Sequence, residues 1–376
     1  MNVYGCTALH EILDDFVVFR NLDPVDSRLP KLQELRDVVD IPAGIVPRKG
    51  NPDYARVVVQ LLKEASKFVD PNFSINELVY LGDTKMNDGN AFKTIAQAGD
   101  WPGIAFIGTE NKNPPVVEHL EEGNTKLFLA NRWSALRDFE SFCIANEFHL
   151  GEGTAVIVDL DKTALGARGR NDHIINQARV EAVRLTVGNL LGEAFDLERF
   201  QAAYDLLNEP DFHFFTTDNQ DYLAYICLIL SAGLYKLDSL VELITRRELE
   251  TFEEFISQVN DRIAALPPAL IEVHNSVYSF VLAGDPTPFK DFRYHEYQTT
   301  VSRMECKGDI NSVSDLLANY LVITQEVRDA ALRWKERGAL LFGLSDKPDE
   351  ASLPREELIA KGFKPIHRVE AYAVGA

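Results

Sequence analysis

The sequence predicts an α/β protein with a doubly wound, mostly parallel sheet and a separate α-helical domain. Short apolar runs alternate with amphipathic helical patterns in the first 165 residues and again near the C-terminus. The stretch between them is mostly helical. Strands that alternate with helices through short loops are typical of a parallel sheet covered on both faces. At 376 residues the chain is long enough for such a core and a second unit.

Helix and strand patterns alternate through the first half of the chain. Asn51 and Pro52, which precede the apolar run VVVQLL, predict a helix that starts just after Lys49. Further on, the apolar patterns predict a strand at 78–81, a helix ending at Gly99, a strand at 103–108, a helix at 134–145 and a strand at 155–158. Residues 1–48 have no assignable pattern.

The second half begins with long amphipathic runs, among them YLAYICLILSAGLYKLDSLVELI and ETFEEFISQVNDRIAAL. Later, TQEVRDAALRWKERG predicts a helix capped by Thr324, ALLFGL predicts a strand with Ser345 at its tip, and IHRVEAYAVG predicts a last strand. These patterns divide the chain into a first core part (1–165), a helical domain (166–321) and a second core part (322–376).

The composition and charge of the chain limit which partners it can bind and in which compartment it is expected. A net charge of -20 and a pI near 4.8 would repel nucleic acid and anionic membranes. There is no apolar stretch long enough to span a bilayer, and the N-terminus lacks a signal-peptide pattern. The four cysteines have no CxxC spacing and are interpreted as buried thiols in a reducing compartment. We expect a cytoplasmic protein without nucleic-acid or membrane partners.

Polar side chains stand where predicted strands end or where a helix begins. They are Asp159, Asp161 and Thr163 in DLDKT, Asp83, Asn87 and Asp88 in GDTKMND, Lys49 in PRKGNP, and Ser345 after LLFGL. Ligands of open parallel sheets bind at the carboxyl ends of the strands. We therefore expect these side chains to converge on one site.

Together these groups have the chemistry of phosphoryl transfer. Asp159 can attack phosphorus and form an aspartyl phosphate. Asp161 can protonate the leaving oxygen and later deprotonate the attacking water. Asp83 and Asp159 offer Mg²⁺ the oxygen ligands that it prefers. Lys49 and Ser345 can stabilise charge on the phosphoryl oxygens.

Four of these segments resemble the motifs of the haloacid dehalogenase-like superfamily of hydrolases. VIVDLDKT looks like its first motif, LLFGLS like its second, RKGNP like its third and VYLGDTKMND like its fourth. The resemblance implies a Mg²⁺-dependent phosphohydrolase acting on a small phosphorylated metabolite, with the helical domain as a cap over the substrate. It implies catalytic roles for Asp159, Asp161, Lys49 and Ser345, and a metal site formed by Asp159, Asp161, Asp83 and Asp88.

The order of the motifs departs from that superfamily. Lys49 and Asp83 precede Asp159 here, and Ser345 comes last. A circular permutation, with the old ends joined between Gly108 and Ala155, restores the usual order and is tolerable where termini are close. The alternative is that residues 1–150 form a separate domain. Residues 346–376 are too few for two more strand–helix units, which favours permutation.

Several residues keep a second interpretation. A calcium-binding loop at DLDKT is disfavoured because Ala164 and Arg170 stand where that loop needs Gly and Glu. Asp88 is a metal ligand, a partner of Lys49 or a helix cap. Arg168, like Arg170 and the neighbouring histidine, either meets an anionic substrate or belongs to a solvated basic turn.

The type of reaction also has alternatives. The resemblance implies that the dehalogenating branch lacks an acid at the position of Asp161, so Asp161 favours phosphoryl chemistry. Thr163 is expected to be a supporting group on the substrate side. A phosphotransferase or phosphomutase would use the same residues, and a non-catalytic binding protein could keep the same scaffold.

Overall fold

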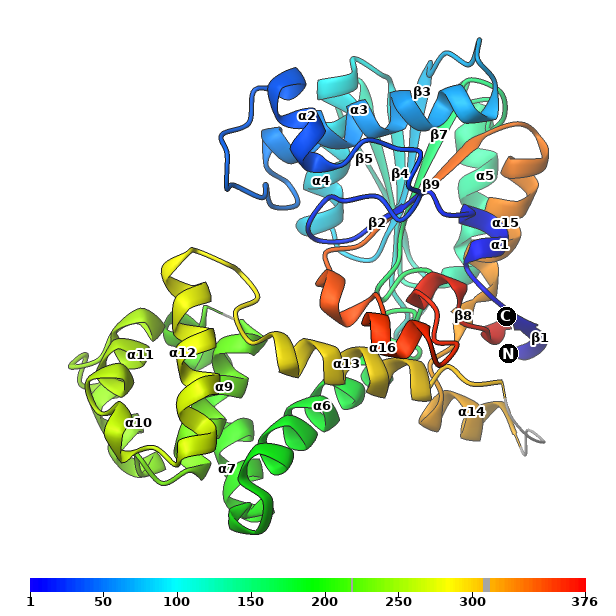
Figure 1. Ribbon diagram of the computed structural model, residues 1–376. Coiled ribbons are helices and arrows are strands. Elements are labelled where there is room, and N and C mark those ends of the chain that lie inside the picture. The colour runs from blue at the N-terminus through cyan, green and yellow to red at the C-terminus, as the bar shows by residue number, and fades with distance from the viewer. Residues whose placement is uncertain (218, 307–311) are drawn as a thin grey trace. The chain divides into compact units, whose positions relative to one another are not determined.

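The computed structural model describes residues 1–217, 219–306 and 312–376, which form two units (Figure 1). The sheet unit comprises Met1–Asn176, Thr300–Leu353 and Leu358–Ala376, and the helical unit comprises Gln177–Thr299 and Pro354–Glu357. The helical unit lies mostly within the predicted range 166–321 but is narrower. The reason is that residues at both ends of that range bond to the sheet unit: Gly166 N donates to Val322 O, and the Asn171 amide donates to Leu317 O and Tyr320 O.

The main sheet has seven strands. Their order across the sheet is β2 (Val17–Val18), β9 (Leu340–Leu344), β7 (Thr154–Asp159), β3 (Glu77–Gly82), β4 (Gly103–Gly108), β6 (Thr125–Ala130) and β5 (Val117–Glu122). All neighbouring pairs are parallel except β5 with β6. The predicted α/β class with a mostly parallel sheet is confirmed.

Helices cover both faces of this sheet, which explains why its central strands are apolar runs without polar alternation. Val79 and Val156 pack on one face with helices α1 (His10–Leu13), α5 (Leu136–Ala145) and α15 (Gln325–Glu336). Leu78 and Ile157 pack on the other face with α2 (Leu32–Val39), α3 (Pro52–Val69) and α4 (Asn87–Gly99). Figure 1 shows these two helical layers on either side of the strands.

A second, three-stranded sheet joins the two ends of the chain. It has the order β1 (Asn2–Thr7), β10 (Ala371–Gly375) and β8 (Ile323–Thr324). Strand β10 runs antiparallel to β1, with Asn2 opposite Gly375, and parallel to β8. The two termini therefore lie side by side, as the N and C marks in Figure 1 show. The helix α14 (Val313–Asn319) contributes Leu316 to the small core beside this sheet.

The helical unit has its own core. Its helices include α7 (Leu197–Leu207), α8 (His213–Thr216), α9 (Gln220–Ser231), α10 (Leu237–Thr245), α11 (Phe252–Asp261) and α12 (Pro268–Leu282). The chain enters this unit through α6 (His173–Leu191) and leaves it through α13 (Lys290–Ser302), and α16 (Glu356–Ile359) spans the last unit boundary. Inside the helical unit, the buried guanidinium of Arg293 pairs with Asp221 and Glu296.

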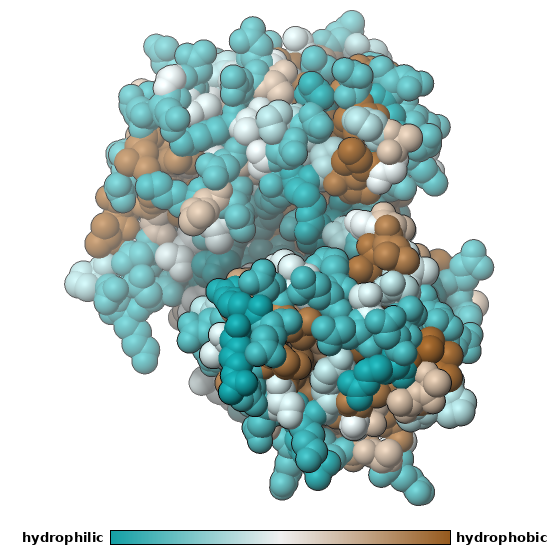
Figure 2. All heavy atoms as spheres, turned by 90° about the vertical axis from the view of Figure 1, so that its left-hand side faces the viewer, coloured by the Kyte–Doolittle hydropathy of each residue, from teal (hydrophilic) through white to brown (hydrophobic). Residues whose placement is uncertain are grey.

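One face of the molecule (Figure 2) is mainly hydrophilic, in line with the 26% of charged residues in the sequence. The face drawn in Figure 2 carries mainly hydrophilic residues, with apolar groups in small patches. Among the described residues, no helix combines the length and apolarity needed to span a membrane.

The cysteine prediction is half right. Cys143 and Cys227 are free and buried, as expected, but Cys6 and Cys306 form a disulfide with their Cα atoms 6.2 Å apart. The two partners are 300 positions apart, so only the tertiary fold, which brings β1 beside the segment after α13, could reveal the pair. The bridge removes the support that the cysteines gave to a reducing compartment.

We expect reduction of this bridge to destabilise the protein. It closes a loop of 300 residues, and loss of a crosslink over so long a loop costs about 2–5 kcal/mol in the free energy of unfolding. Urea unfolding with and without dithiothreitol measures the change. The Cys6→Ser/Cys306→Ser variant is the control: it should match the reduced protein and show no response to the reductant. Equal urea midpoints for the oxidised and reduced protein would contradict the prediction.

Candidate active site

Three neighbouring strands end together at the carboxyl edge of the main sheet. Asp159, the last residue of β7, pairs with Leu344 of β9 on one side, and Val158 pairs with Leu81 of β3 on the other. Ser345 and Asp83 each follow one of these flanking strands within a residue or two. Segments that are far apart in the sequence therefore meet at one edge, as predicted from the strand pattern.

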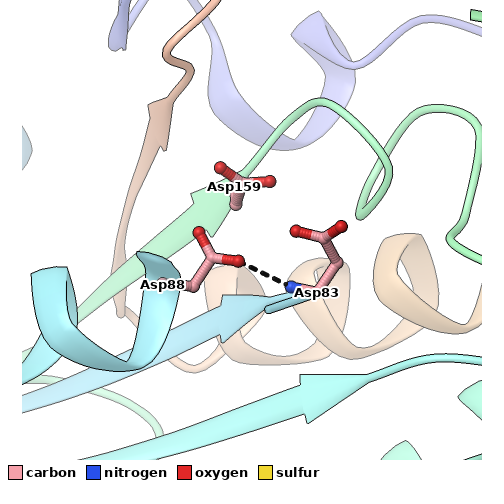
Figure 3. A group of neighbouring side chains, drawn as sticks. All are labelled: Asp83, Asp88 and Asp159. Atoms are coloured by element: carbon pink, nitrogen blue, oxygen red, sulfur yellow. Dashed lines mark hydrogen bonds between the residues drawn. The ribbon is translucent and has the colours of Figure 1, made fainter. Parts of the chain in front are cut away.

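A cluster of three carboxylates forms at this edge (Figure 3). Asp83, Asp88 and Asp159 each contribute one oxygen, and these oxygens lie within 4.8 Å of one another. Asp88 comes from the first turn of α4 and is 1% exposed, and Asp159 is 4% exposed. Charged oxygens at this separation repel one another, and only a nearby cation offsets that repulsion.

Lys49 is such a cation. Its Nζ lies 2.5 Å from Asp88 Oδ1 and 2.6 Å from Asp159 Oδ1, in a loop ahead of α3. Asn51 caps that helix through Asp53 N, which fixes the chain two residues after the lysine. Burial disfavours the charge of Lys49, but Asp159, Tyr80 and Asp88 outweigh it and raise the lysine pKa well above its usual range. The amine is a permanent positive charge between two carboxylates.

The structure bears on two of the three predicted roles of Asp88, the partner of Lys49 and the helix cap. The carboxylate pairs with Lys49, and its second oxygen accepts hydrogen bonds from Asp83 N at 3.0 Å and Thr84 N at 2.7 Å. The residue at the helix cap position is Met86. Burial acts to raise the pKa of Asp88, but Lys49 and these hydrogen bonds lower it below its usual range. Asp88 is an ionised partner of Lys49.

Asp159 and Asp83, the other two carboxylates, have surroundings that disfavour their ionised forms. Burial raises the pKa of Asp159 well above its usual range, and the charges of Asp88 and Asp83 act in the same direction against Lys49. Burial and Asp88 raise the pKa of Asp83 to about 7, although Arg168 opposes them. A divalent cation in the cluster would favour the ionised form of both groups.

Residues after β7 orient Asp159. The Thr163 hydroxyl, which is fully buried, donates to Asp159 Oδ2 at 3.0 Å. Thr163 was predicted on the substrate side, and the structure gives it this supporting contact. Asp161 lies half-buried in the turn that follows the strand, outside the cluster of three carboxylates found in the described part of the chain. Three of the four predicted metal ligands therefore come together.

Ser345 lies at the end of β9, beside the end of β7, and is 3% exposed. Its backbone N donates to Val18 O at 3.0 Å, and its hydroxyl accepts a hydrogen bond from Lys347 N at 3.0 Å. The first bond continues the pairing of β9 with β2, and the second folds the start of the following loop back onto Ser345. The predicted position of Ser345 at a strand tip is correct.

The two predicted substrate-binding arginines have different surroundings. Arg168 Nε donates to Asp83 Oδ2, so this side chain belongs to the cluster. The side chain of Arg170 is 1% exposed and pairs with Glu110 and Glu326. Its guanidinium also donates to Val374 O. The prediction of a substrate contact for Arg170 is therefore corrected to a structural ion pair between the sheet unit's segments.

Tyr80 is a site residue that the sequence did not reveal. Its hydroxyl donates to Asp88 Oδ1 at 3.3 Å, and Lys49 Nζ lies 5.9 Å from its ring centroid. Burial raises the pKa of Tyr80 well above its usual range, so the phenol stays a neutral donor. A tyrosine inside an apolar strand looks like a core residue, and only the pairing of β3 beside α4 shows its second contact.

Asp349, in the loop after β9, gives a pH-dependent prediction. Burial raises its pKa from 3.8 to about 7, although Asn21 N donates to its carboxylate. Between about pH 4 and pH 7, the folded state binds a proton at Asp349 that the unfolded state has lost. The stability that this proton contributes therefore disappears as the pH rises from about 4 to 7. Asp349→Asn cannot lose a proton, so it should be more stable than the parent by about 1–2 kcal/mol at pH 8 and by much less at pH 5.

Urea midpoints at the two pH values measure this difference. Asp100→Asn, at an exposed helix end, makes the same substitution without burial and should give no difference between pH 5 and pH 8. An Asp349→Asn variant that is no more stable than the parent at pH 8 would show that the buried carboxyl carries no penalty.

Comparisons of this chain with models of protein families, with curated proteins and with solved structures give no match. The oxygen-only donor set of Asp83, Asp88 and Asp159 suits a hard divalent cation such as Mg²⁺, and the raised pKa values of two of these groups indicate a site short of positive charge.

Proposed function

We propose that the protein is a Mg²⁺-dependent phosphohydrolase that acts on a small phosphomonoester through an aspartyl phosphate at Asp159. The observation that carries this proposal is the convergence of Lys49, Asp83, Asp88 and Asp159, which come from three separate segments of the chain. A lone acidic cluster is common on protein surfaces. A buried one that shares a lysine at the end of a central parallel strand is the arrangement that phosphoryl transfer needs.

The order of the strands supports the haloacid dehalogenase-like resemblance. Strand β7 with Asp159 lies between β9, which leads to Ser345, and β3, which leads to Asp83. The four motif-like segments thus surround one strand end although their order in the chain is changed. We propose a circularly permuted core of this superfamily, with the helical unit in the role of cap.

The first half-reaction transfers the phosphoryl group to the protein. A carboxylate oxygen of Asp159 attacks phosphorus, the bond from phosphorus to the ester oxygen breaks, and the leaving oxygen takes the proton of Asp161. The Thr163 hydroxyl holds the other carboxylate oxygen, which orients the attack. Lys49 supplies fixed positive charge beside the phosphoryl oxygens.

The second half-reaction regenerates the carboxylate. Asp161, now ionised, takes a proton from water as the water oxygen attacks phosphorus. The bond between Asp159 and phosphorus breaks, and inorganic phosphate leaves. Asp83, Asp88 and Asp159 would hold Mg²⁺, which supplies charge neutralisation for the transferring phosphoryl group.

A panel of phosphomonoesters with Mg²⁺ or with EDTA tests the proposal. We expect sustained release of inorganic phosphate from at least one ester with Mg²⁺ and none with EDTA. Sustained release also separates a hydrolase from a mutase, which would return the phosphoryl group to another substrate position. A folded protein that binds Mg²⁺ but releases no phosphate from any ester would contradict the hydrolase.

A further inference from the structure

The side chain of Arg168 contacts the carboxylate cluster and is itself partly exposed to solvent. Its Nε donates to Asp83 Oδ2. The Asp83 side chain is only 7% exposed, whereas the Arg168 side chain is 35% exposed. Of the two partners, the arginine is the one that can move into water, and its departure leaves the buried Asp83 carboxylate in need of another cation.

The backbone that carries Arg168 is fixed at several points. Arg168 N donates to Lys162 O, and Arg168 O accepts hydrogen bonds from Glu110 N at 2.9 Å and Trp133 Nε1 at 3.2 Å. Gly169 has φ +76°, and a Cβ there would lie 1.8 Å from Glu110 O. Any change at Arg168 is therefore a movement of its side chain, with the main chain in place.

Arg170 strengthens this anchorage on the other side of the glycine. Its guanidinium bonds both oxygens of Glu326 at 2.9 Å and Glu110 Oε2 at 2.8 Å. Two arginines separated by one residue thus have opposite surroundings: Arg170 is buried between fixed carboxylates, and Arg168 is on the open side of the cluster. The loop thus presents one partly exposed guanidinium from a backbone that is held by hydrogen bonds.

The charge balance of the cluster bears on the role of this guanidinium. The three carboxylates with Lys49 and Arg168 leave one net negative charge when all are ionised, and a divalent cation would turn this into one net positive charge. Departure of Arg168 would restore neutrality. A metal ion on Asp83 would thus compete with the guanidinium for the same carboxylate, and the displaced guanidinium would be free to bind an anion.

We propose that Arg168 is an exchangeable counter-ion: a divalent metal ion displaces its guanidinium from Asp83, and the freed guanidinium then binds the anionic substrate. The substrate half of this inference rests on the proposed phosphohydrolase function, whereas the exchange on Asp83 does not. Arg168 is thus a substrate-binding residue only after the metal has bound, which makes metal first and substrate second the order of binding.

Metal binding to the substrate-free full-length protein tests the exchange. Electron paramagnetic resonance of free Mn²⁺ gives the dissociation constant for each variant. Arg168→Gln and Arg168→Met remove the competing charge and should bind Mn²⁺ roughly tenfold more tightly than the parent. Arg168→Lys keeps the charge and should stay near the parent value. Arg333→Gln, which removes a similarly exposed arginine on α15 paired with Glu140, is the matched control and should change nothing.

A second measurement follows the exchange in the parent protein and uses a variant only to assign the signal. The NMR signal of the Arg168 Nε–H group, assigned by its absence in Arg168→Gln, should shift when Mg²⁺ is added to the parent protein. Unchanged or weaker Mn²⁺ binding in both neutral variants, or an Arg168 signal that does not respond to Mg²⁺, would overturn the exchange.

Steady-state kinetics at saturating Mg²⁺ test the substrate half. Arg168→Gln should raise KM roughly tenfold with little change in kcat, since it removes a binding contact and leaves the reacting groups in place. An unchanged KM would overturn the substrate contact. Tighter Mn²⁺ binding in a protein whose parent hydrolyses no ester would support the exchange and refute the hydrolase, so the two failures can be told apart.

Discussion

Asp159→Asn should lower kcat for phosphomonoester hydrolysis roughly a thousandfold or more, because an amide cannot form the aspartyl phosphate on which the proposed route depends. The fold should not suffer. The pKa of Asp159 is raised mainly by burial and also by its neighbouring carboxylates, so loss of its charge removes a repulsion inside the cluster. An asparagine oxygen can still accept the hydrogen bond of Thr163. We expect equal or greater stability together with almost no turnover.

The control for this variant is another aspartate with little exposure. Asp26 is 7% exposed and pairs with Arg28 in the N-terminal part of the sheet unit. Asp26→Asn should leave kcat unchanged. Phosphate release is measured at saturating Mg²⁺, and the urea midpoint is measured in parallel. If Asp159→Asn kept more than about a tenth of the parent kcat, the carboxylate would not be the nucleophile and the covalent mechanism would be wrong.

The part of the site that sequence reasoning found depends on local rules. A buried parallel strand is an unbroken apolar run, and its carboxyl end lies at the same edge as that of its neighbours. Asp159, Asp83 and Ser345 could therefore be placed together from the pattern alone. Lys49 was located by the helix cap that follows it at Asn51, and its contact with Asp159 is the outcome that the strand pattern led us to expect.

The parts that sequence reasoning missed depend on contacts between distant segments. Strand β5 reads VEHLEE, and most of its residues are exposed, so it has no apolar pattern and is a strand only because it pairs with β6. Strand β10 was predicted, but its place beside β1 was not, and the disulfide of Cys6 was missed for the same reason. Propensity cannot report such pairings.

The two arginines after β7 show the same limit at the scale of one side chain. Arg168 and Arg170 looked equivalent in the sequence, as two cations near an expected anionic substrate. Their difference is set by Gly169, whose positive φ lies between them, and by Glu326, which is 156 positions from Arg170. Arg170 is buried because Glu110 and Glu326 lie beside it, whereas the side chain of Arg168 is partly exposed.

Lys49→Met should both abolish turnover and destabilise the metal-free protein, by about 3–5 kcal/mol in the free energy of unfolding. The amine is the cation shared by Asp88 and Asp159, and its side chain is only 10% exposed. Methionine has nearly the same length and no charge, so it leaves two buried carboxylates facing each other without creating a large cavity. The measurement is the urea midpoint in EDTA.

The pH dependence of this loss follows from its cause. Without Lys49, the pKa of Asp88 in the folded state should rise above its unfolded value, because burial is then unopposed by the amine. The folded state would then bind more protons than the unfolded state, and its stability would fall as the pH rises through that pKa. The loss in Lys49→Met should therefore be greater at pH 8 than at pH 5.

Two forms of rescue make the interpretation specific to charge. Adding Asp159→Asn to Lys49→Met removes one of the facing carboxylates and should recover part of the lost stability, so that the two substitutions are not additive. Saturating Mg²⁺ should also recover part of it, because a cation that binds only the folded state stabilises that state. Turnover should recover in neither case, since the amine that neutralises the phosphoryl oxygens is still absent. A Lys49→Met protein as stable as the parent in EDTA would mean that the carboxylates of the cluster are not charged together, and the argument for a metal at this site would lose its electrostatic basis.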